Sequence, residues 1–350
     1  MEVRKLIDQL DVEKHLSCRE WIYLWQNYSD ADRLYAAELA VKIARTHYGK
    51  NIFVRGIVEF ANYCSNDCFY CGIRRSNHKV QRYSLSNEQI KACCRSGWEN
   101  GIRTFVLQSG EAGRLDLERL CNLVRELKSD FPECAVTLSL GELAFAEYQA
   151  LRQAGADRYL LRHESANSGH YRKMHPEYMS LQHRLECLDM LKTLGYQTGC
   201  GIMTGSPFQT AECLADDMLF MEKFQPHMVG IGPFIPHCDT PFGQYPAGSL
   251  ELTLMALSLC RIMLPEVLLP ATTALGTLQQ DGRILGILAG ANVIMPNLTP
   301  PAVQNNYNLY NNKIHTDDGV RQFMQQLHDQ LAQINYTAVV GRGDFGDKIC

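Results

Sequence analysis

The chain has 350 residues, enough for one large domain or two ordinary ones. Hydrophobic residues make up 46% and charged residues 21%, an ordinary globular balance that excludes a disordered or fibrous protein. The net charge of −4 gives no electrostatic reason to expect binding to nucleic acid or to a membrane surface.

Cysteine is the unusual component, with 14 residues. A secreted disulfide scaffold would be shorter and would follow a signal peptide. Residues 1–8 instead carry charges where an apolar signal core would stand, and the best apolar stretch, residues 284–296, is too short to span a bilayer. We therefore predict a soluble cytoplasmic protein without nucleic-acid or membrane partners, whose thiols stay reduced.

The first 50 residues are predicted to be helical. Two capping boxes, each a serine followed three residues later by an acidic residue, mark helix N-termini. They are Ser17 with Glu20, before a helix over 18–26, and Ser29 with Asp32, before a helix that ends near residue 47. Because this region carries no obvious chemistry, residues 1–50 are expected to form an N-terminal helical cap.

Strands and helices alternate from residue 51 onward. The expected strands are 52–60, 103–108, 135–140, 157–163, 196–203, 227–232, 267–273 and 291–296. The expected helices are 86–101, 115–129, 142–154, 180–194, 210–223, 249–263, 278–289 and 317–333. Eight alternations predict an α/β protein with a (β/α)8 TIM-type barrel over 51–300, on which a C-terminal segment over 301–350 packs. An open doubly wound sheet, which alternates in the same way, is the alternative fold.

Polar residues gather where several of these strands end, which in such a barrel is where function resides. They are Gln108 to Glu111 after the second strand, Ser139 to Glu142 after the third, Arg162 to Glu164 after the fourth, and Thr272 with Thr273 after the seventh. Since side chains alternate along a strand, Arg162 and Glu164 share one face, as do Arg55 and Glu59. Charges on an inward face predict a barrel cavity with polar contents.

Three closely spaced cysteines follow the first strand: Cys64, Cys68 and Cys71. Thiolates are soft ligands that suit zinc or an iron–sulfur cluster. A structural zinc site needs four ligands, and the fourth would have to be His78 or a distant residue. In a [4Fe–4S] cluster, three thiolates leave one iron open, and an open metal position is where a small molecule can bind and react.

This triplet has the aromatic Tyr70 before its last cysteine and lies after the first barrel strand, and it resembles the motif of the radical S-adenosylmethionine (SAM) superfamily. The resemblance implies one [4Fe–4S] cluster on the three cysteines, whose open iron is chelated by the amino and carboxylate groups of SAM. An electron from the cluster then cleaves the sulfonium and releases a 5′-deoxyadenosyl radical. The segment that holds the methionine amino group in that family resembles the end of the second strand, Ser109, Gly110 and Glu111.

Seven further segments resemble one subfamily, the [FeFe]-hydrogenase maturase HydE. They are residues 57–62, 106–111, 137–142, 154–164, 229–237, 270–274 and 290–297. The likeness runs from about residue 50 to 312 and returns weakly at 341–344. It implies that SAM is contacted by Ser139, Glu164 and Arg184. It also implies an anion-accepting substrate pocket in the barrel, lined by Arg55, Arg162, Thr272 and Thr273. A tyrosine pair, Tyr307 and Tyr310, is implied over the barrel mouth.

A departure from the subfamily concerns a second cluster, which some members carry on cysteines near the C-terminus. The corresponding residues 312–317 contain no cysteine, and Cys350 stands alone. We therefore predict a single [4Fe–4S] cluster.

The resemblance implies an enzyme of [FeFe]-hydrogenase H-cluster assembly whose adenosyl radical attacks the sulfur of an iron carbonyl–cyanide cysteine unit. The expected partners are the maturases HydG and HydF and a low-potential electron donor, ferredoxin or flavodoxin. Two alternatives stay open: a methylornithine synthase-like radical SAM mutase, and a non-catalytic iron–sulfur or zinc scaffold. The scaffold would explain the cysteine triplet but not Ser139, Glu164 and Arg184 around one mouth.

Overall fold

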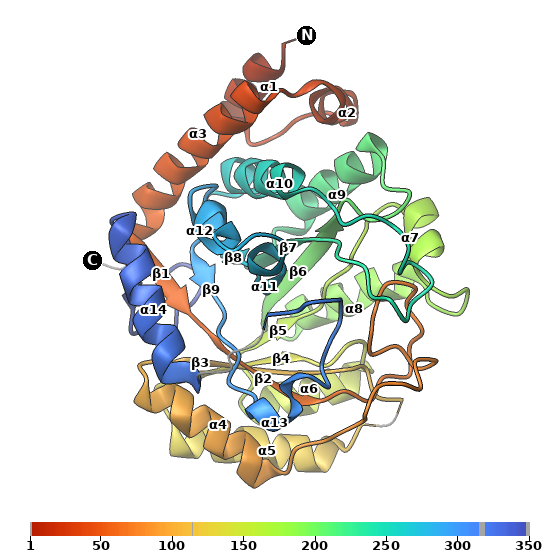
Figure 1. Cartoon of the computed structure of the whole chain (residues 1–350), viewed down its shortest axis with the longest axis vertical. Coiled ribbons are helices and arrows are strands. Elements are labelled where there is room, and N and C mark those ends of the chain that lie inside the picture. The colour runs from red at the N-terminus through yellow and green to blue at the C-terminus, as the bar shows by residue number, and fades with distance from the viewer. Residues whose placement is uncertain (1, 114, 315–318, 348–350) are drawn as a thin grey trace.

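Parallel strands ring the centre of the protein, and helices pack around them (Figure 1). The computed structural model describes residues 2–113, 115–314 and 319–347. The strands are β1 (Asn51–Val54), β2 (Gly56–Ala61), β3 (Thr104–Ser109), β4 (Ala135–Ser139), β5 (Arg158–Leu160), β6 (Gln197–Thr204), β7 (Met228–Pro233), β8 (Pro270–Ala271), β9 (Val293–Ile294) and β10 (Thr337–Val339). The helices are α1 (Val3–Glu13), α2 (Cys18–Asn27), α3 (Asp30–Tyr48), α4 (Asn87–Glu99), α5 (Leu117–Asp130), α6 (Phe145–Gln153), α7 (Ser168–Met174), α8 (Leu181–Thr193), α9 (Ala211–Phe224), α10 (Leu250–Met263), α11 (Thr273–Leu278), α12 (Gly282–Ile287), α13 (Pro301–Gln304) and α14 (Gly319–Gln333).

The strands form two parallel sheets that meet at both edges. One sheet has the order β2-β3-β4-β5-β6-β7 and the other the order β10-β1-β9-β8. At the first junction β1 continues into β2 through Arg55 alone, and Ile57 bridges to Asn297 beyond β9. At the second, Met228 of β7 bridges to Leu268, just before β8. The arrangement is the predicted TIM-type barrel, with an irregular ladder at these two junctions.

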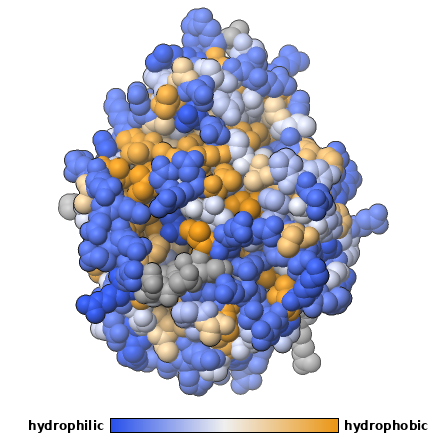
Figure 2. Space-filling view, in the orientation of Figure 1, coloured by the Kyte–Doolittle hydropathy of each residue, from blue (hydrophilic) through white to orange (hydrophobic). Residues whose placement is uncertain are grey.

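Capping and burial explain the helical layers. The capping boxes predicted at Ser17 and Ser29 are both formed. α10 is apolar all round because it lies between the barrel strands and helix α3 of the N-terminal region. Figure 2 shows apolar residues gathered around α10 and α12 on the viewed face, with hydrophilic residues at their rim. Within the described parts of the chain, no helix is both long and apolar enough to cross a bilayer.

Six further cysteines lie on helices and are buried there. They are Cys93, Cys94, Cys121, Cys187, Cys213 and Cys260. Burial raises the pKa of these thiols where a shift is resolved, as for Cys260, whose pKa rises to about 12. Such thiols stay protonated at neutral pH and behave as small apolar side chains.

Two predicted strands are shorter or more divided than expected. The predicted strand 52–60 is divided at Arg55 because its first half pairs with β9 and β10 whereas its second half pairs with β3. Of the predicted strand 157–163, only the three residues of β5, 158–160, form a strand. Glu164, just beyond it, has a left-handed φ of 63°, which a regular strand cannot accommodate.

The C-terminal part of the barrel also differs from the prediction. The predicted strand 267–273 keeps only two residues, and the predicted helix 278–289 is replaced by α11 and α12. Gln279 between them is extended, and Gly282 approaches α11 so closely that a Cβ would lie 2.1 Å from the Leu275 carbonyl oxygen. The predicted helix 317–333 is observed from Gly319, since residues 315–318 lie outside the described residues. Helix α7 and strand β10 are absent from the prediction.

The segment after β10 covers the amino ends of the barrel strands. Three residues that open β3, β5 and β6 donate hydrogen bonds to this segment: Thr104 to the Arg342 carbonyl, Arg158 to the Arg342 carbonyl and the Asp344 carboxylate, and Gln197 to the Asp344 carboxylate. Arg158 is 3% exposed and pairs with the Asp344 carboxylate, which also accepts a hydrogen bond from Arg342 Nε at 2.7 Å. Burial opposes the charge on Asp344, but the hydrogen bond from Arg342 and the charge of Arg158 outweigh it and lower the pKa of Asp344 to about 2.

Replacing Asp344 should therefore destabilise the protein at neutral pH. Asp344→Asn removes the counter-charge of buried Arg158, and we expect the free energy of unfolding to fall by about 2–4 kcal/mol at pH 7. The lowered pKa of Asp344 stabilises the folded protein fully above about pH 4, the pKa of an aspartate in the unfolded chain. This stabilisation is lost as the pH falls toward 2, so the difference in unfolding free energy between the variant and the unchanged protein should shrink over that range. Anaerobic urea unfolding followed by circular dichroism measures both effects. The control Asp329→Asn, on the exposed side of α14, should change stability by less than about 0.5 kcal/mol; equal losses in the two variants would contradict the role of Asp344.

Candidate active site at the carboxyl ends of the barrel strands

The structure brings all but one of the predicted site residues to a single cavity. The cavity has a volume of about 310 Å³ and lies where the barrel strands end. The predicted residues that line it are Cys64, Cys68, Cys71, Ser109, Gly110, Glu111, Ser139, Arg162, Glu164, Arg184, Thr272, Thr273, Tyr307 and Tyr310. Residues from six strands and their loops therefore converge on one space, as expected for a barrel mouth.

The cysteine loop that follows β2 is tied to three other segments by backbone hydrogen bonds. Ser65 N–H donates to the Glu111 carbonyl at 2.7 Å, Phe69 N–H to Met174 at the end of α7 at 2.9 Å, and Gly72 N–H to Leu309 at 2.8 Å. Each bond fixes a backbone position next to one of the cysteines. The loop is thus held by the chain ends of β3 and α7 and by the segment before α14, rather than by regular structure of its own.

The three thiols lie in an environment that suits a metal cluster and disfavours free thiolates. Burial raises the pKa of Cys64, and burial together with the neighbouring Cys64 thiol raises the pKa of Cys71 to about 12. Burial and the proximity of the other two thiols raise the pKa of Cys68 well above its ordinary value. Three such groups can all ionise only when a cation binds them, and soft thiolates fit iron. The donor set therefore fits an iron–sulfur cluster with one iron left without a protein ligand.

Glycine at the end of β3 is required by close packing against the cysteine loop. A Cβ at Gly110 would lie 2.4 Å from the Tyr63 carbonyl oxygen and 2.9 Å from Cys64 Cβ. Gly141, after β4, has a φ of 83°, and a Cβ there would lie 2.1 Å from Glu111 Oε2. Both positions let backbone and side chains approach the cavity more closely than any other residue allows.

Arg184 reaches the cavity from helix α8 and is almost completely buried. Its Nε donates to Glu142 Oε1 at 2.8 Å, and its Nη2 lies 3.7 Å from Glu111 Oε2. Burial raises the pKa of the Glu142 carboxyl, although the charge of Arg184 works in the opposite direction. Helical position alone would have suggested a surface charge for Arg184; only the resemblance to a known family indicated a place in the site.

Glu164 occupies a strained backbone position at the cavity wall. Its φ of 63° is uncommon for a residue other than glycine, and its carboxylate lies 3.1 Å from Arg162 Nη2. Arg162 in turn donates to the Ile202 carbonyl at 2.5 Å. Backbone strain of this kind is concentrated at functional sites, where the surrounding fold holds the residue in place.

Arg55 is the predicted residue that the structure does not bring to this cavity. It lies at the break between β1 and β2, deeper in the barrel than Ile57 and Glu59, which do line the cavity. Its guanidinium is 1% exposed and bonds to the Gly343 carbonyl at 2.9 Å. The structure therefore does not place Arg55 in the cavity that Arg162 lines, because the C-terminal segment occupies the space next to Arg55.

Lys313 is a cavity residue that the sequence analysis missed. Its ammonium pairs with Glu59 and also donates to the Tyr307 carbonyl at 2.9 Å. Strand alternation places Arg55 on the same face as Glu59, but the ion-pair partner of Glu59 is Lys313. Lys313 is the only basic residue other than histidine between Arg283 and Arg321, which is the one signal that could have singled it out.

The contact between Gly110 and the cysteine loop leads to a test of cluster assembly. Gly110→Ala should push Cys64 out of position, and we expect less than half of the iron and acid-labile sulfide that the unchanged protein takes up on anaerobic reconstitution. Gly113→Ala is the matched control, since its Cβ would lie 3.4 Å from Ser65 Cβ, an ordinary contact. Full iron and sulfide in the Gly110 variant would show that the loop tolerates the added methyl group.

Comparison with known proteins identifies the family to which the chain belongs. The family model described as the radical SAM superfamily matches residues 58–221. The [FeFe] hydrogenase maturase subunit HydE of Thermotoga maritima is 46% identical over 277 residues, which cover 79% of this chain and 79% of that protein. The 3-methylornithine synthase of Methanosarcina barkeri is 29% identical over 271 residues, which cover 77% of this chain and 75% of that protein.

Among solved structures, that of the methylornithine synthase PylB has a TM-score of 0.84 and 25% sequence identity, over 95% of this chain and 97% of that one. This likeness supports the barrel fold along nearly the whole chain. The sequence identity to the maturase of Thermotoga maritima, 46%, is much higher than that to PylB, and the aligned residues cover more than two thirds of both proteins. The chain therefore belongs to the radical SAM superfamily, whose enzymes use a [4Fe–4S] cluster and SAM, and within it to the family of the [FeFe] hydrogenase maturase subunit HydE.

Proposed function

We propose that this radical SAM enzyme acts in assembly of the [FeFe]-hydrogenase H-cluster. In this proposal it cleaves SAM reductively, and the 5′-deoxyadenosyl radical attacks the sulfur of an iron carbonyl–cyanide cysteine substrate. The observation that carries the proposal is that one cavity is lined by two sets of groups: the three thiols with Arg184 and Glu164, and Arg162 with hydroxyl groups. The 46% identity to HydE of Thermotoga maritima supports the choice of reaction.

The cofactor half of the cavity has groups suited to the cluster and to the polar parts of the methionine and ribose of SAM. Cys64, Cys68 and Cys71 would hold the cluster, which supplies the electron for the cleavage when it is bound and reduced. Arg184 would pair with the methionine carboxylate, a charge-assisted contact that fits a guanidinium. Glu164 would accept hydrogen bonds from the ribose hydroxyls or the amino group. Ser109 to Glu111 and Ser139 complete the wall from the ends of β3 and β4.

The substrate half of the cavity is suited to an anionic or cyanide-bearing molecule. Arg162 supplies a guanidinium, and Thr272, Thr273 and Tyr310 supply hydroxyl groups. Thr272 Oγ1 is buried and has no hydrogen-bond partner in the described part of the chain, so it is free to bind a ligand. Burial raises the pKa of Tyr310 to about 12, and the phenol therefore stays protonated as a hydrogen-bond donor at neutral pH.

The proposed partners follow from the same assignment. The maturase HydG would supply the substrate, the maturase HydF would receive the product, and ferredoxin or flavodoxin would supply the electron.

A methylornithine synthase-like mutase is the second candidate function, favoured by the shared fold and the 29% identity to the Methanosarcina barkeri enzyme. Restoration of hydrogenase activity in a maturase-deletion strain would support the maturase. Conversion of lysine to methylornithine without restoration would support the mutase.

The radical chemistry has a direct assay. After anaerobic reconstitution and reduction with dithionite, the protein should release 5′-deoxyadenosine and methionine from SAM in equal amounts. Cys68→Ser should abolish both products, because the cluster then loses one of its three protein ligands. Cys260→Ser, which changes a buried thiol in α10 away from the cavity, is the matched control and should retain activity. A protein with full iron and sulfide that forms neither product would overturn the proposal.

The role proposed for Arg184 is tested by SAM binding. Arg184→Gln should weaken SAM binding about 10- to 100-fold, since a hydrogen bond between charged groups contributes roughly 1.5–3 kcal/mol. Cluster content should not change. Equilibrium dialysis with labelled SAM on the reconstituted protein measures the affinity, and Arg172→Gln at the exposed end of α7 is the control. Unchanged affinity in the Arg184 variant would remove the residue from the SAM site.

A further inference from the structure

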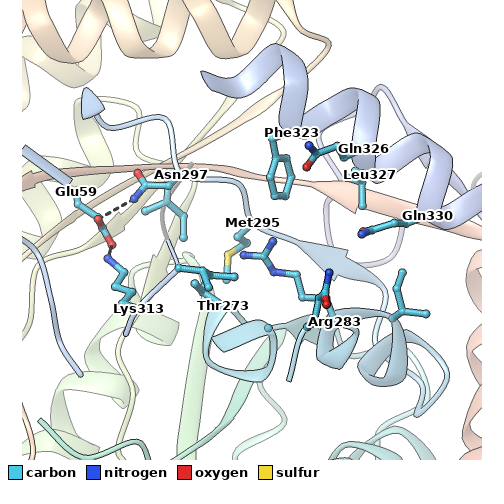
Figure 3. A pocket seen from close by; sticks show the side chains of 15 residues that line it. Glu59, Thr273, Arg283, Met295, Asn297, Lys313, Phe323, Gln326, Leu327 and Gln330 are labelled. Atoms are coloured by element: carbon cyan, nitrogen blue, oxygen red, sulfur yellow. Dashed lines mark hydrogen bonds and ion pairs between the residues drawn. The ribbon is translucent and has the colours of Figure 1, made fainter. Parts of the chain in front are cut away.

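A second cavity lies beside the catalytic one, between the barrel wall and the C-terminal helix α14 (Figure 3). Its volume is about 200 Å³, and α11, α12, α14 and the strand β2 contribute its walls. The two cavities share the wall residues Ile57, Glu59, Thr273, Met295 and Lys313. We call this space the side cavity. The reaction proposed above does not use the side cavity.

The charges around the side cavity do not balance among the described residues. Lys313 and Glu59 neutralise each other, and Asn297 Nδ2 donates to Glu59 Oε2 at 3.0 Å. The remaining cation in the wall is Arg283 of α12, and no carboxylate of the described residues pairs with it. Its guanidinium carbon instead lies 5.3 Å from the centroid of the Phe323 ring. The described walls therefore carry one net positive charge.

Arg283 is half-buried, and no anionic side chain among the described residues compensates its charge. Burial lowers the pKa of its guanidinium to about 10, and the nearby Tyr310 offsets this effect only in part. Figure 3 shows the side chain of Arg283 extending from α12 into the space toward Met295, with Phe323 and Leu327 of α14 on the far side. A guanidinium that faces a partly enclosed cavity without a counter-charge offers an anion both a charge and hydrogen-bond donors.

We propose that the side cavity binds a small monocarboxylate with an aliphatic body. A guanidinium matches the two oxygens of a carboxylate, and a single net positive charge suits a monoanion better than a phosphate dianion. Apolar side chains of Ile284, Met295, Phe323 and Leu327 would contact the aliphatic body. Three exposed glutamines at the rim offer amide donors at the solvent side: Gln280, Gln326 and Gln330. The inference does not depend on the proposed reaction.

The binding site is tested with trifluoroacetate, a monocarboxylate with an apolar body that fluorine NMR detects. The reconstituted protein is first saturated with SAM, and line broadening of trifluoroacetate is then titrated. We expect saturable binding that propionate displaces and that inorganic phosphate at the same concentration does not. Arg283→Gln should weaken binding at least about 10-fold, as expected for the loss of a charge-assisted contact. Arg321→Gln, which removes an exposed guanidinium on α14 outside the cavity, is the matched control and should bind as the unchanged protein does.

A second variant tests the geometry while it keeps the charge. A Cβ at Gly276 would lie 3.3 Å from Arg283 Nε and 3.0 Å from Ile314 Cδ1, so Gly276→Ala narrows the side cavity around the guanidinium. This variant should also weaken trifluoroacetate binding, with circular dichroism confirming that it is folded. Equal affinities in the Arg283 and Arg321 variants would overturn the proposal. So would stronger displacement by phosphate than by propionate.

Discussion

The cysteine loop gathers three thiols in a space where burial and mutual repulsion both oppose their ionisation. Backbone hydrogen bonds to Glu111, Met174 and Leu309 hold the loop where its three thiols can bind one cluster. Gly110 has no side chain because the loop passes directly over it. Much of the surrounding structure can be understood as support for this loop: β3 ends beneath it, α7 ends beside it, and the segment before α14 lies against its last cysteine.

Buried charges occur at three depths along the barrel, and each level joins distant parts of the chain. Arg158 and Asp344 lie at the amino ends of the strands, Glu59 and Lys313 lie halfway, and the cluster of Arg184, Glu111 and Glu142 lies at the mouth. Breaking one partner of a buried pair is strongly destabilising, so these pairs fix how the segments meet. The two upper levels line the cavity, so a bound ligand can reach their charges, whereas Arg158 and Asp344 lie outside it.

Local sequence patterns predicted much of the fold because they act over a few residues. The capping boxes at Ser17 and Ser29, the alternation of strands and helices, and the polar residues at strand ends all required only short-range information. The division of the first strand at Arg55 could not be predicted in this way, because it arises from the pairing of β1 with β10, almost 300 residues later in the chain. The same applies to the pairing of Glu59 with Lys313 and to the occupation of the space beside Arg55 by Gly343. Ser139 and Glu164 had a local signal in their position at strand ends, whereas Arg184 was placed by resemblance alone.

The pairing of β1 with β10 has a consequence for how the protein is made. Asn51 pairs with Thr337, and Asp344 follows only a few residues later, so these contacts cannot form until almost 300 residues after β1 have been synthesised. Contacts of such long sequence separation form slowly, and the edge of β1 stays unpaired in the meantime. The cysteine loop leaves the ribosome early, while the segment carrying Leu309, which closes over it, comes late. There is thus an interval during biosynthesis in which the loop is accessible to iron and sulfide donors from the side that the finished barrel covers.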